Sequence, residues 1–152
     1  MTNQEIQEAV ESAVKTGNWI IRADNDGVSH NGFKWSGIGE WTESPDWNEE
    51  PECGGGLHGQ DANHGGYIKG TRLVFCDTEG KHVPIGSDKI KVRRARILLI
   101  NELPELPACK ELDVSDTNIT ELPELPACES LEVHGTKITE LPELPANCRI
   151  YR

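Results

Sequence analysis

The chain has 152 residues with 26 acidic and 15 basic side chains, which gives a formal net charge of −11 at pH 7. This negative charge argues against binding to duplex DNA or to an anionic membrane, because proteins hold phosphate groups with basic surfaces. No apolar stretch approaches the roughly 20 residues of a membrane-spanning helix, and the first residues lack the apolar core of a signal peptide. We therefore expect a cytoplasmic protein.

The five cysteines are an odd number without the close spacing of a disulfide framework. No two of them are separated by only two residues, as in the commonest zinc and redox motifs. The sequence therefore predicts reduced thiols.

Residues 3–16 predict a helix, because apolar residues recur there every three to four positions. Thr2 and Glu5 have the spacing of a capping box, and Gly17 is a stop signal. Three later segments predict strands: residues 18–23, 70–77 and 88–100. The sequence DNDG after the first of them predicts a turn.

Residues 32–67, called the wrap below, form a long stretch without a regular hydrophobic pattern. Loops of this length in compact domains are usually functional or disordered. Trp35, Trp41 and Trp47 provide aromatic area that favours burial, so we expect an ordered but irregular segment.

The wrap contains the sequence CGGGLHGQDANHGG at residues 53–66. Consecutive glycines let backbone N–H groups converge on an anion, or let another part of the chain approach closely. No Lys-Ser or Lys-Thr pair follows, as in a Walker loop, and no apolar strand precedes, as in the dinucleotide-binding fingerprint. A tight structural turn and a nucleotide contact both stay open.

A nucleotide site near this motif would combine aromatic faces that stack on a base, backbone amides that hold phosphate, and basic side chains that balance charge. The candidate residues are Trp35, Trp41, Gly54, Gly55, Gly56, His58 and Arg72.

Two sulfurs and two imidazoles could instead bind zinc. The candidate ligands are Cys53, His58, His64 and Cys76, although their spacing matches no common structural zinc site. Cys76 with a distant histidine could act as a thiol nucleophile, but its apolar surroundings favour a buried cysteine. His30 and His82 are expected at the surface.

The C-terminal part contains an internal repeat with a period of 19 residues, whose units start at residues 102, 121 and 140. In the first unit Leu112 and Val114 are two positions apart, as in a strand with one buried face. Proline-rich returns connect the units. One unit cannot bury its own leucines, so we expect the units to stack into a parallel ladder.

The repeat resembles the short leucine-rich repeats of bacterial effector proteins, whose units read LxxLxVxxNxLTxLPxLP. The residues that carry the resemblance are Leu112, Val114, Ile119, Thr120, Leu122, Pro123, Leu125 and Pro126. The resemblance implies a parallel β solenoid, with Thr117 and Thr136 at the position of the family's asparagine.

Residues 89–93 can supply the first strand of the ladder, because Ile90 and Val92 align with Leu112 and Val114 in an upstream unit that is three residues longer. Under this interpretation the two halves of the chain form one body.

We therefore expect an α+β fold. A small helix-plus-sheet domain, residues 1–88, would be continuous with a short parallel leucine-rich-repeat solenoid, residues 89–152. The strand at residues 89–97 would be shared by both.

In-register parallel strands place equivalent side chains about 4.8 Å apart, so outward-facing columns can be predicted. Asp113 beside Glu132 is a like-charge pair that costs roughly a few tenths of a kcal/mol, which favours a contact surface for a basic partner. The predicted partner-binding residues are Lys91, Glu111, Asp113, Glu132, His134 and Tyr151. The unpaired last strand also allows a homodimer through its edge.

Residues 18–100 resemble small domains that occur in phage and prophage genomes. The residues that carry this resemblance are Asn31, Gly32, Phe33 and Trp35, PDW at 45–47, CGGGLHG at 53–59 and KIKVRRARI at 89–97. The resemblance brings no established activity. It implies a phage accessory protein in the cytoplasm of an infected or lysogenic bacterium.

Together these features favour a non-catalytic binding protein, such as a counter-defence factor that contacts a host protein through its acidic surface or its repeat face. The alternative is a protein that sequesters or turns over a signalling nucleotide in a pocket of the wrap. An enzymatic activity stays open, and no cofactor is predicted.

Overall fold

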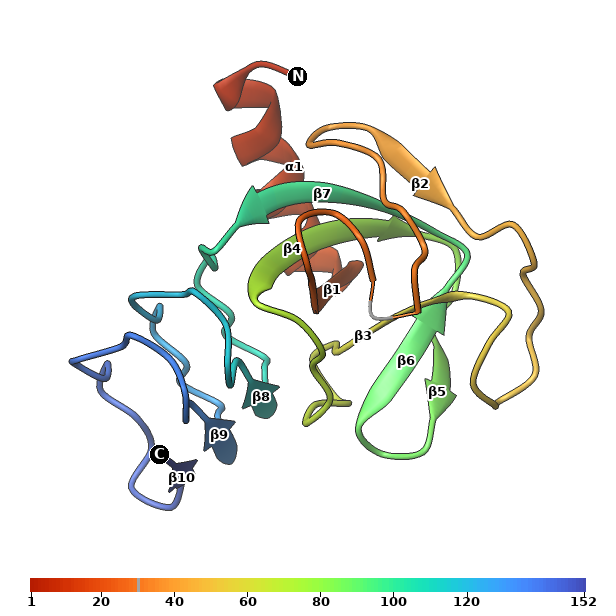
Figure 1. Ribbon diagram of the computed structural model, residues 1–152. Coiled ribbons are helices and arrows are strands. Elements are labelled where there is room, and N and C mark those ends of the chain that lie inside the picture. The colour runs from red at the N-terminus through yellow and green to blue at the C-terminus, as the bar shows by residue number, and fades with distance from the viewer. Residues whose placement is uncertain (30) are drawn as a thin grey trace.

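The computed structural model describes residues 1–29 and 31–152, so the prediction for His30 lies outside the described residues. The described residues fold into one helix and three small sheets (Figure 1), an arrangement that agrees with the predicted α+β class. The elements are α1 (Asn3–Thr16), β1 (Trp19–Asp24), β2 (Trp41–Glu43), β3 (Leu57–Gly59), β4 (Arg72–Glu79), β5 (Val83–Ile85), β6 (Lys89–Val92), β7 (Arg94–Ile100), β8 (Glu111–Asp113), β9 (Ser130–Glu132) and β10 (Arg149–Tyr151).

Helix α1 begins and ends at the predicted residues. The Thr2 hydroxyl accepts a hydrogen bond from the Glu5 N–H, and the Glu5 carboxylate accepts one from the Thr2 N–H. Gly17 ends the helix in a left-handed conformation. Val10 is buried in a core that it shares with Phe75 of β4. No helix in residues 1–29 and 31–152 is long and apolar enough to cross a membrane.

The largest sheet is antiparallel, with the strand order β1-β4-β7-β2. Alternate side chains point to its two faces. Ile21 and Phe75 belong to the core beneath α1, whereas Ile20 and Cys76 belong to a second core with Trp35. Both faces of the sheet are therefore covered by apolar residues.

Strand β6 does not continue into the repeat, which corrects the prediction that residues 89–97 are shared with the ladder. It pairs antiparallel with β3 on one side and with β5 on the other, and after Arg93 the chain enters β7 of the largest sheet. Because both edges of β6 are occupied, it cannot supply the first strand of a parallel ladder. The predicted alignment of Ile90 with Leu112 is therefore wrong.

The repeat forms a third sheet of three short parallel strands, β8, β9 and β10, called the ladder below. Leu112 lies opposite Leu131, and Leu131 opposite Ile150, so the register follows the 19-residue period. The hydroxyls of Thr117 and Thr136 each donate to the carbonyl three residues earlier, so the turn after β8 and the turn after β9 are closed in the same way. The other strand pairs in the described part of the chain are antiparallel.

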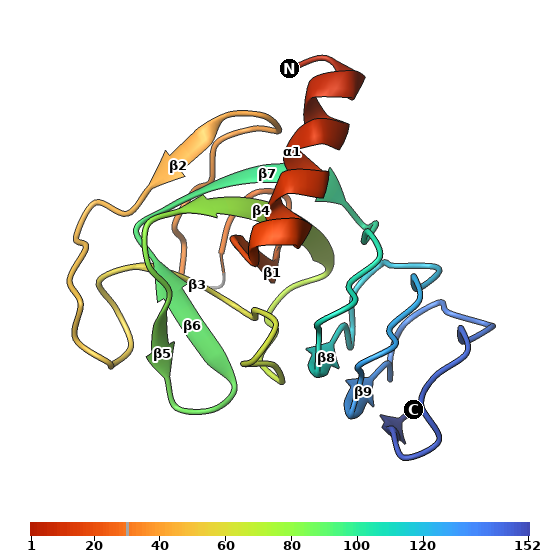
Figure 2. The same cartoon turned by 180° about the vertical axis from the view of Figure 1, so that it is seen from behind.

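The edge of β8 that faces away from β9 is covered by residues 60–71 (Figure 2). The carbonyl of Ala62 accepts a hydrogen bond from the Lys110 N–H at 3.1 Å, and the carbonyl of Thr71 accepts one from the Asn118 N–H at 2.8 Å. Apolar residues of α1, of the largest sheet and of the ladder belong to one core cluster. This loop therefore joins the ladder to the N-terminal part of the protein.

Candidate functional site

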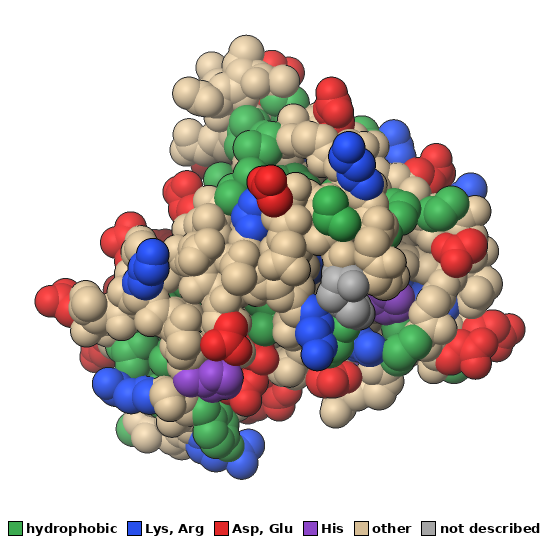
Figure 3. Space-filling view, in the orientation of Figure 1, with side chains coloured by type: hydrophobic (Ala, Val, Ile, Leu, Met, Phe, Trp, Pro, Cys, Tyr) green, Lys and Arg blue, Asp and Glu red, His purple; other side chains and the backbone are tan. Residues whose placement is uncertain are grey.

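The ladder presents two outward-facing columns in the predicted register. One contains Glu111, Ser130 and Arg149, and the next contains Asp113, Glu132 and Tyr151. His134 follows β9 and is exposed. Over this part of the surface, at the lower left of Figure 3, acidic, basic and hydrophobic side chains are interspersed. The ladder therefore brings together five of the six predicted partner-binding residues, but one of the five, Asp113, is buried at 6% exposed and is not available to a partner.

The sixth residue, Lys91, does not lie on this face. It belongs to β6 and is 0% exposed. Its Nζ donates to Oδ1 of Asn48 at 2.9 Å and to the carbonyl of Gly54 at 3.0 Å, and it lies 5.9 Å from the centre of the Trp47 ring. Lys91 is thus an anchor for the wrap, because its charged end is satisfied inside the protein.

Asp113 and Glu132 interact across β8 and β9. The carboxylate of Asp113 is buried and accepts hydrogen bonds from the N–H and the hydroxyl of Ser115. A side-chain hydrogen bond with Asp113 raises the pKa of Glu132, and burial and the negative charge of Asp113 act in the same direction. The predicted like-charge pair is therefore present, and it raises the pKa of Glu132.

A cavity of about 170 Å³ opens between β1, the wrap and residues 67–69. Its lining includes Arg22 from β1, Phe33, residues 54–59 and Tyr67 from the wrap, and Lys69 from the loop after it. The glycine motif therefore forms one wall of a cavity that also contains aromatic rings and two basic side chains.

Arg22 is held in this cavity with its guanidinium 4.3 Å from the centre of the Trp35 ring. Its Nη1 donates to the carbonyl of His58 at 3.0 Å. Its Nε is buried without a hydrogen-bond partner among the described residues, as is Nε1 of Trp35. Burial lowers the pKa of Arg22, an effect that the more distant carboxylate of Asp24 opposes. The cation is therefore incompletely compensated.

The predicted nucleotide-binding residues are only partly brought together. Gly54, Gly55, Gly56 and His58 line the cavity. Trp35 is 6% exposed and packs on Arg22, so it supports the lining instead of forming it.

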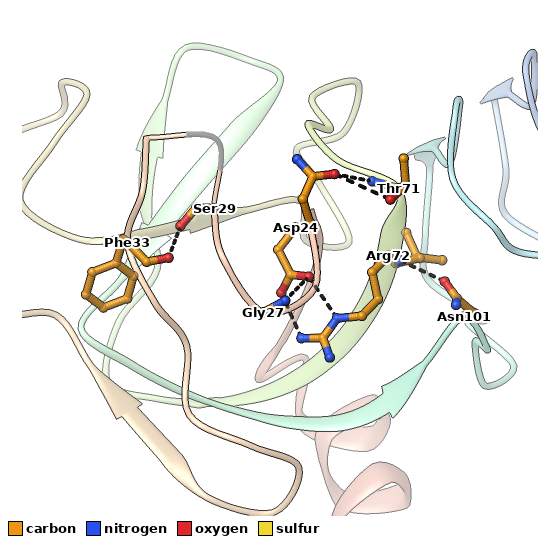
Figure 4. A network of polar contacts seen from close by, with 9 residues as sticks. Asp24, Gly27, Ser29, Phe33, Thr71, Arg72 and Asn101 are labelled. Atoms are coloured by element: carbon orange, nitrogen blue, oxygen red, sulfur yellow. Dashed lines mark hydrogen bonds and ion pairs between the residues drawn. The ribbon is translucent and has the colours of Figure 1, made fainter.

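Trp41 and Arg72 lie outside the cavity, which corrects both predictions. Trp41, on β2, has Arg94 and Arg96 at 4.6 Å and 4.5 Å from its ring centre. Arg72 is opposite Asp24 in the register of β1 and β4 and binds its carboxylate through two hydrogen bonds of 2.8 Å and 2.9 Å (Figure 4). Because the guanidinium of Arg72 is already bound to Asp24, it is not available to bind a ligand.

The role of Arg22 was missed although its position carried a signal. It is a charged residue within the apolar strand sequence WIIRAD, where alternation predicts a buried side chain on one of the two covered faces. Arg22 is half-buried between residues that are buried, and a charge in such a position needs a partner, which makes it a candidate for a binding site. No sequence pattern indicated that Tyr67 and Lys69 lie nearby.

The predicted zinc ligands do not form a metal site. Cys53 is exposed, Cys76 is fully buried in β4, and Nδ1 of His64 contacts Oδ1 of Asp61 at 2.9 Å. In the described part of the chain, no group of three or more His, Cys, Asp or Glu side chains is placed to hold a metal ion. Burial raises the pKa of Cys76 to about 12, so its thiol is unsuited to nucleophilic attack.

Asp61 links three other polar side chains. Its two carboxylate oxygens contact Nδ1 of His64 and Nδ1 of His82, each at 2.9 Å, and Nε2 of His82 contacts the Thr78 hydroxyl at 2.9 Å. This order of hydroxyl, imidazole and carboxylate is also found in hydrolase triads. Thr78, however, is only 6% exposed within β4, so the network fastens the wrap to the sheet. His82 is consequently half-buried and not the surface residue that was predicted.

Comparisons of the chain with protein-family models, with curated proteins and with solved structures give no match. The class of protein therefore has to be inferred from its own residues. One candidate site is the cavity that contains Arg22. The other is the ladder face, the outward side of the ladder formed by Glu111, Ser130, Glu132, His134, Arg149 and Tyr151.

Proposed function

We propose that the protein is a non-catalytic binding protein that presents the ladder face to a protein partner. The observation that carries this proposal is the register of β8, β9 and β10, which aligns Glu111, Glu132 and Tyr151 with their neighbours in two outward columns. Tyr151 is 47% exposed. Aromatic residues with polar groups around them are typical of protein interfaces.

The charge of the repeat favours a partner with a basic surface. Residues 101–152 contain 11 acidic and 4 basic side chains, whereas residues 1–100 contain 15 and 11. Complementary charge speeds association and selects among partners. An acidic surface of this kind can also occupy a site that normally holds nucleic acid, because clustered carboxylates resemble phosphates in charge.

The resemblances found in the sequence suggest the biological setting. We infer that the three repeat units form a short solenoid of the leucine-rich-repeat type, attached to a phage-type domain. A counter-defence role in the bacterial cytoplasm, by contact with a host protein, agrees with both features.

The test is affinity capture from a bacterial lysate with the immobilised full chain. We expect a defined protein to be retained by the wild type and lost with the double variant Glu132→Lys, Tyr151→Ala. Glu8→Lys, on the exposed side of α1, is the matched control because it makes the same change of charge away from the ladder, and it should retain the protein. Equal retention by all three proteins would exclude the ladder face as the contact.

The ladder also allows association through β10. This strand pairs with β9 only, within the described residues, and its three residues are exposed. Free strand edges accept further strands, so we propose a homodimer formed by two β10 edges. Sedimentation velocity should show a concentration-dependent dimer that Ile150→Pro abolishes, because proline removes a backbone N–H from this edge.

A second candidate function is the binding of a nucleotide-class ligand, either for sequestration or for turnover. One observation favours it: Gly54, Gly55, Gly56 and His58 line a cavity together with two aromatic rings and two basic residues. A thermal-shift panel of mononucleotides, cyclic nucleotides and NAD-derived nucleotides tests it. At least one should raise the melting temperature, and the absence of any shift would exclude this function.

A further inference from the structure

Arg22 is a cationic group with incomplete surroundings, because its Nε is buried and has no hydrogen-bond partner among the described residues. Two other arginines of the largest sheet are neutralised: Arg72 is bound to Asp24 at 2.8 Å, and Arg96 to Asp77 at 2.6 Å. In the described part of the chain no carboxylate lies within 4.0 Å of the Arg22 guanidinium, although that group is packed between Trp35 and the carbonyl of His58. Buried charges without a partner are costly, and an oxyanion would supply the missing one.

The remaining lining of the cavity suits an oxyanion. Lys69 adds a second basic group, and the described lining residues include one acidic residue, Asp46, which accepts a hydrogen bond from the Ser44 hydroxyl at 3.1 Å. The charged groups of the lining are thus two basic and one acidic, whereas the whole chain has a net charge of −11. Tyr67 and Phe33 give the same cavity two aromatic surfaces for the carbon part of a ligand.

The size of the cavity restricts the ligand. Pockets for drug-sized ligands are roughly 300–1,000 Å³, whereas this one has about 170 Å³. That volume fits a phosphate group with a small attached carbon skeleton, and it leaves no room for the base of a complete nucleotide. A nucleotide would therefore enter with its phosphate first and keep its base outside.

We propose that Arg22 and Lys69 bind the phosphate group of a small phosphate monoester in this cavity. Arg22 donates to the phosphate oxygens from the edge of its guanidinium, and the flexible Lys69 closes over the opposite side. Trp35 keeps the guanidinium in place by stacking beneath it. This inference rests on the second candidate function and extends it by naming the phosphate, not the base, as the recognised group.

The experiment is isothermal titration calorimetry of the full chain at low salt with ribose 5-phosphate, AMP, adenosine and inorganic phosphate. We expect ribose 5-phosphate, AMP and inorganic phosphate to bind and adenosine not to bind. Arg22→Gln should weaken the binding of ribose 5-phosphate by roughly tenfold or more, because it removes a charge-assisted pair. Arg93→Gln is the matched control, since Arg93 is exposed and outside the cavity, and it should bind as the wild type does.

A second variant keeps the test valid if Arg22→Gln fails to fold. Lys69 is exposed, so Lys69→Gln should leave the fold intact and weaken ribose 5-phosphate binding by roughly threefold to tenfold. Binding that is unchanged in Lys69→Gln and in a folded Arg22→Gln would overturn the proposal. Binding of adenosine without ribose 5-phosphate would also overturn it, but would leave the nucleotide-binding function standing. Failure of all four compounds, together with a flat nucleotide panel, would reject both.

Discussion

The side chain of Gln60 pairs with the backbone of Asp113 as a neighbouring strand would. Its Nε2 donates to the Asp113 carbonyl at 2.8 Å, and its Oε1 accepts from the Asp113 N–H at 2.9 Å. The same Oε1 accepts from the Gly66 N–H at 2.9 Å. Gln60 is 1% exposed, so this one amide closes the first edge of the ladder and connects it to the N-terminal sheets.

Gln60→Ala should therefore lower the free energy of unfolding by about 3 kcal/mol, because it removes three hydrogen bonds and leaves buried backbone groups of Asp113 without partners. Urea denaturation followed by circular dichroism measures this. Gln7→Ala, on the exposed side of α1, is the control and should change the free energy by less than about 0.5 kcal/mol. A loss for Gln60→Ala as small as for the control would mean that the amide does not hold the ladder.

Gly65 allows the loop to approach β8 closely. A Cβ at this position would overlap the carbonyl oxygen of Glu111, which is backbone and cannot turn aside. Gly65→Ala should cost about 2 kcal/mol or more through displacement of the loop. Gly37→Ala is a suitable control, because its Cβ would meet only the Glu40 side chain, at 3.9 Å. The same urea titration compares the two, and equal stability of both variants would contradict this close approach.

Asp61 should make stability depend on pH in the acid range. Burial acts to raise the pKa of Asp61, but hydrogen bonds from His82 and His64 outweigh it, and the pKa is lowered below the usual 3.8. The native state then binds its proton less readily than the unfolded state. The stabilisation is present above about pH 4 and is lost as the pH falls through the native pKa.

Asp61→Asn should accordingly be less stable than the wild type by about 1–3 kcal/mol at pH 7, and the difference should shrink below about pH 4. Urea titrations between pH 2 and pH 7, roughly the range of the linkage, measure it. A difference that stays constant over this range would show that the Asp61 carboxylate does not titrate as described.

Glu132 should have the opposite effect on the pH dependence. Its pKa is raised above the usual 4.5, so the native state binds the proton more tightly than the unfolded state and stability is lost as the pH rises through the native pKa. Glu132→Gln keeps a donor toward Asp113 at every pH. It should be more stable than the wild type by roughly 0.2–1 kcal/mol at pH 7, with the gain disappearing toward pH 4. A stabilisation of the same size at both pH values would contradict the raised pKa of Glu132.

The five thiols should differ sharply in reactivity. Cys53 is exposed and Cys148 is half-buried, whereas Cys76, Cys109 and Cys128 are buried. Burial raises the pKa of each buried thiol to about 12, so almost no thiolate is present at neutral pH. With Ellman's reagent, Cys53 should react fast, Cys148 slowly, and the other three only after unfolding. Rapid reaction of more than two thiols in the native protein would show that the cores are open.

Local elements could be predicted from the sequence because their causes are local. The capping box of Thr2 and Glu5 and the stop at Gly17 set the bounds of α1. The 19-residue period sets the register of the ladder, since identical units can stack in only one way.

The attachment of the ladder could not be predicted in this way. Lys89–Val92 has the alternation of a ladder strand, but one of its edges pairs with β5, the strand just before it, and the other with β3, which lies far away in the sequence. The residues that take its place next to β8 act through one side chain, Gln60, and through the carbonyls of an irregular loop. Neither leaves a periodic pattern. The cavity could likewise be predicted only in part. The glycine motif can be recognised in the sequence, whereas only the fold brings Arg22 next to it.

The most direct test of this account is hydrogen–deuterium exchange of backbone amides in β8 and β9, in the wild type and in Gln60→Ala. If the loop holds the ladder as a preformed binding face, these amides will be protected in the wild type nearly as well as those of β4. They will become exposed in Gln60→Ala while β4 stays protected. Fast exchange of β8 and β9 in the wild type would show that residues 101–152 do not form a rigid face, and the proposed function would then be wrong.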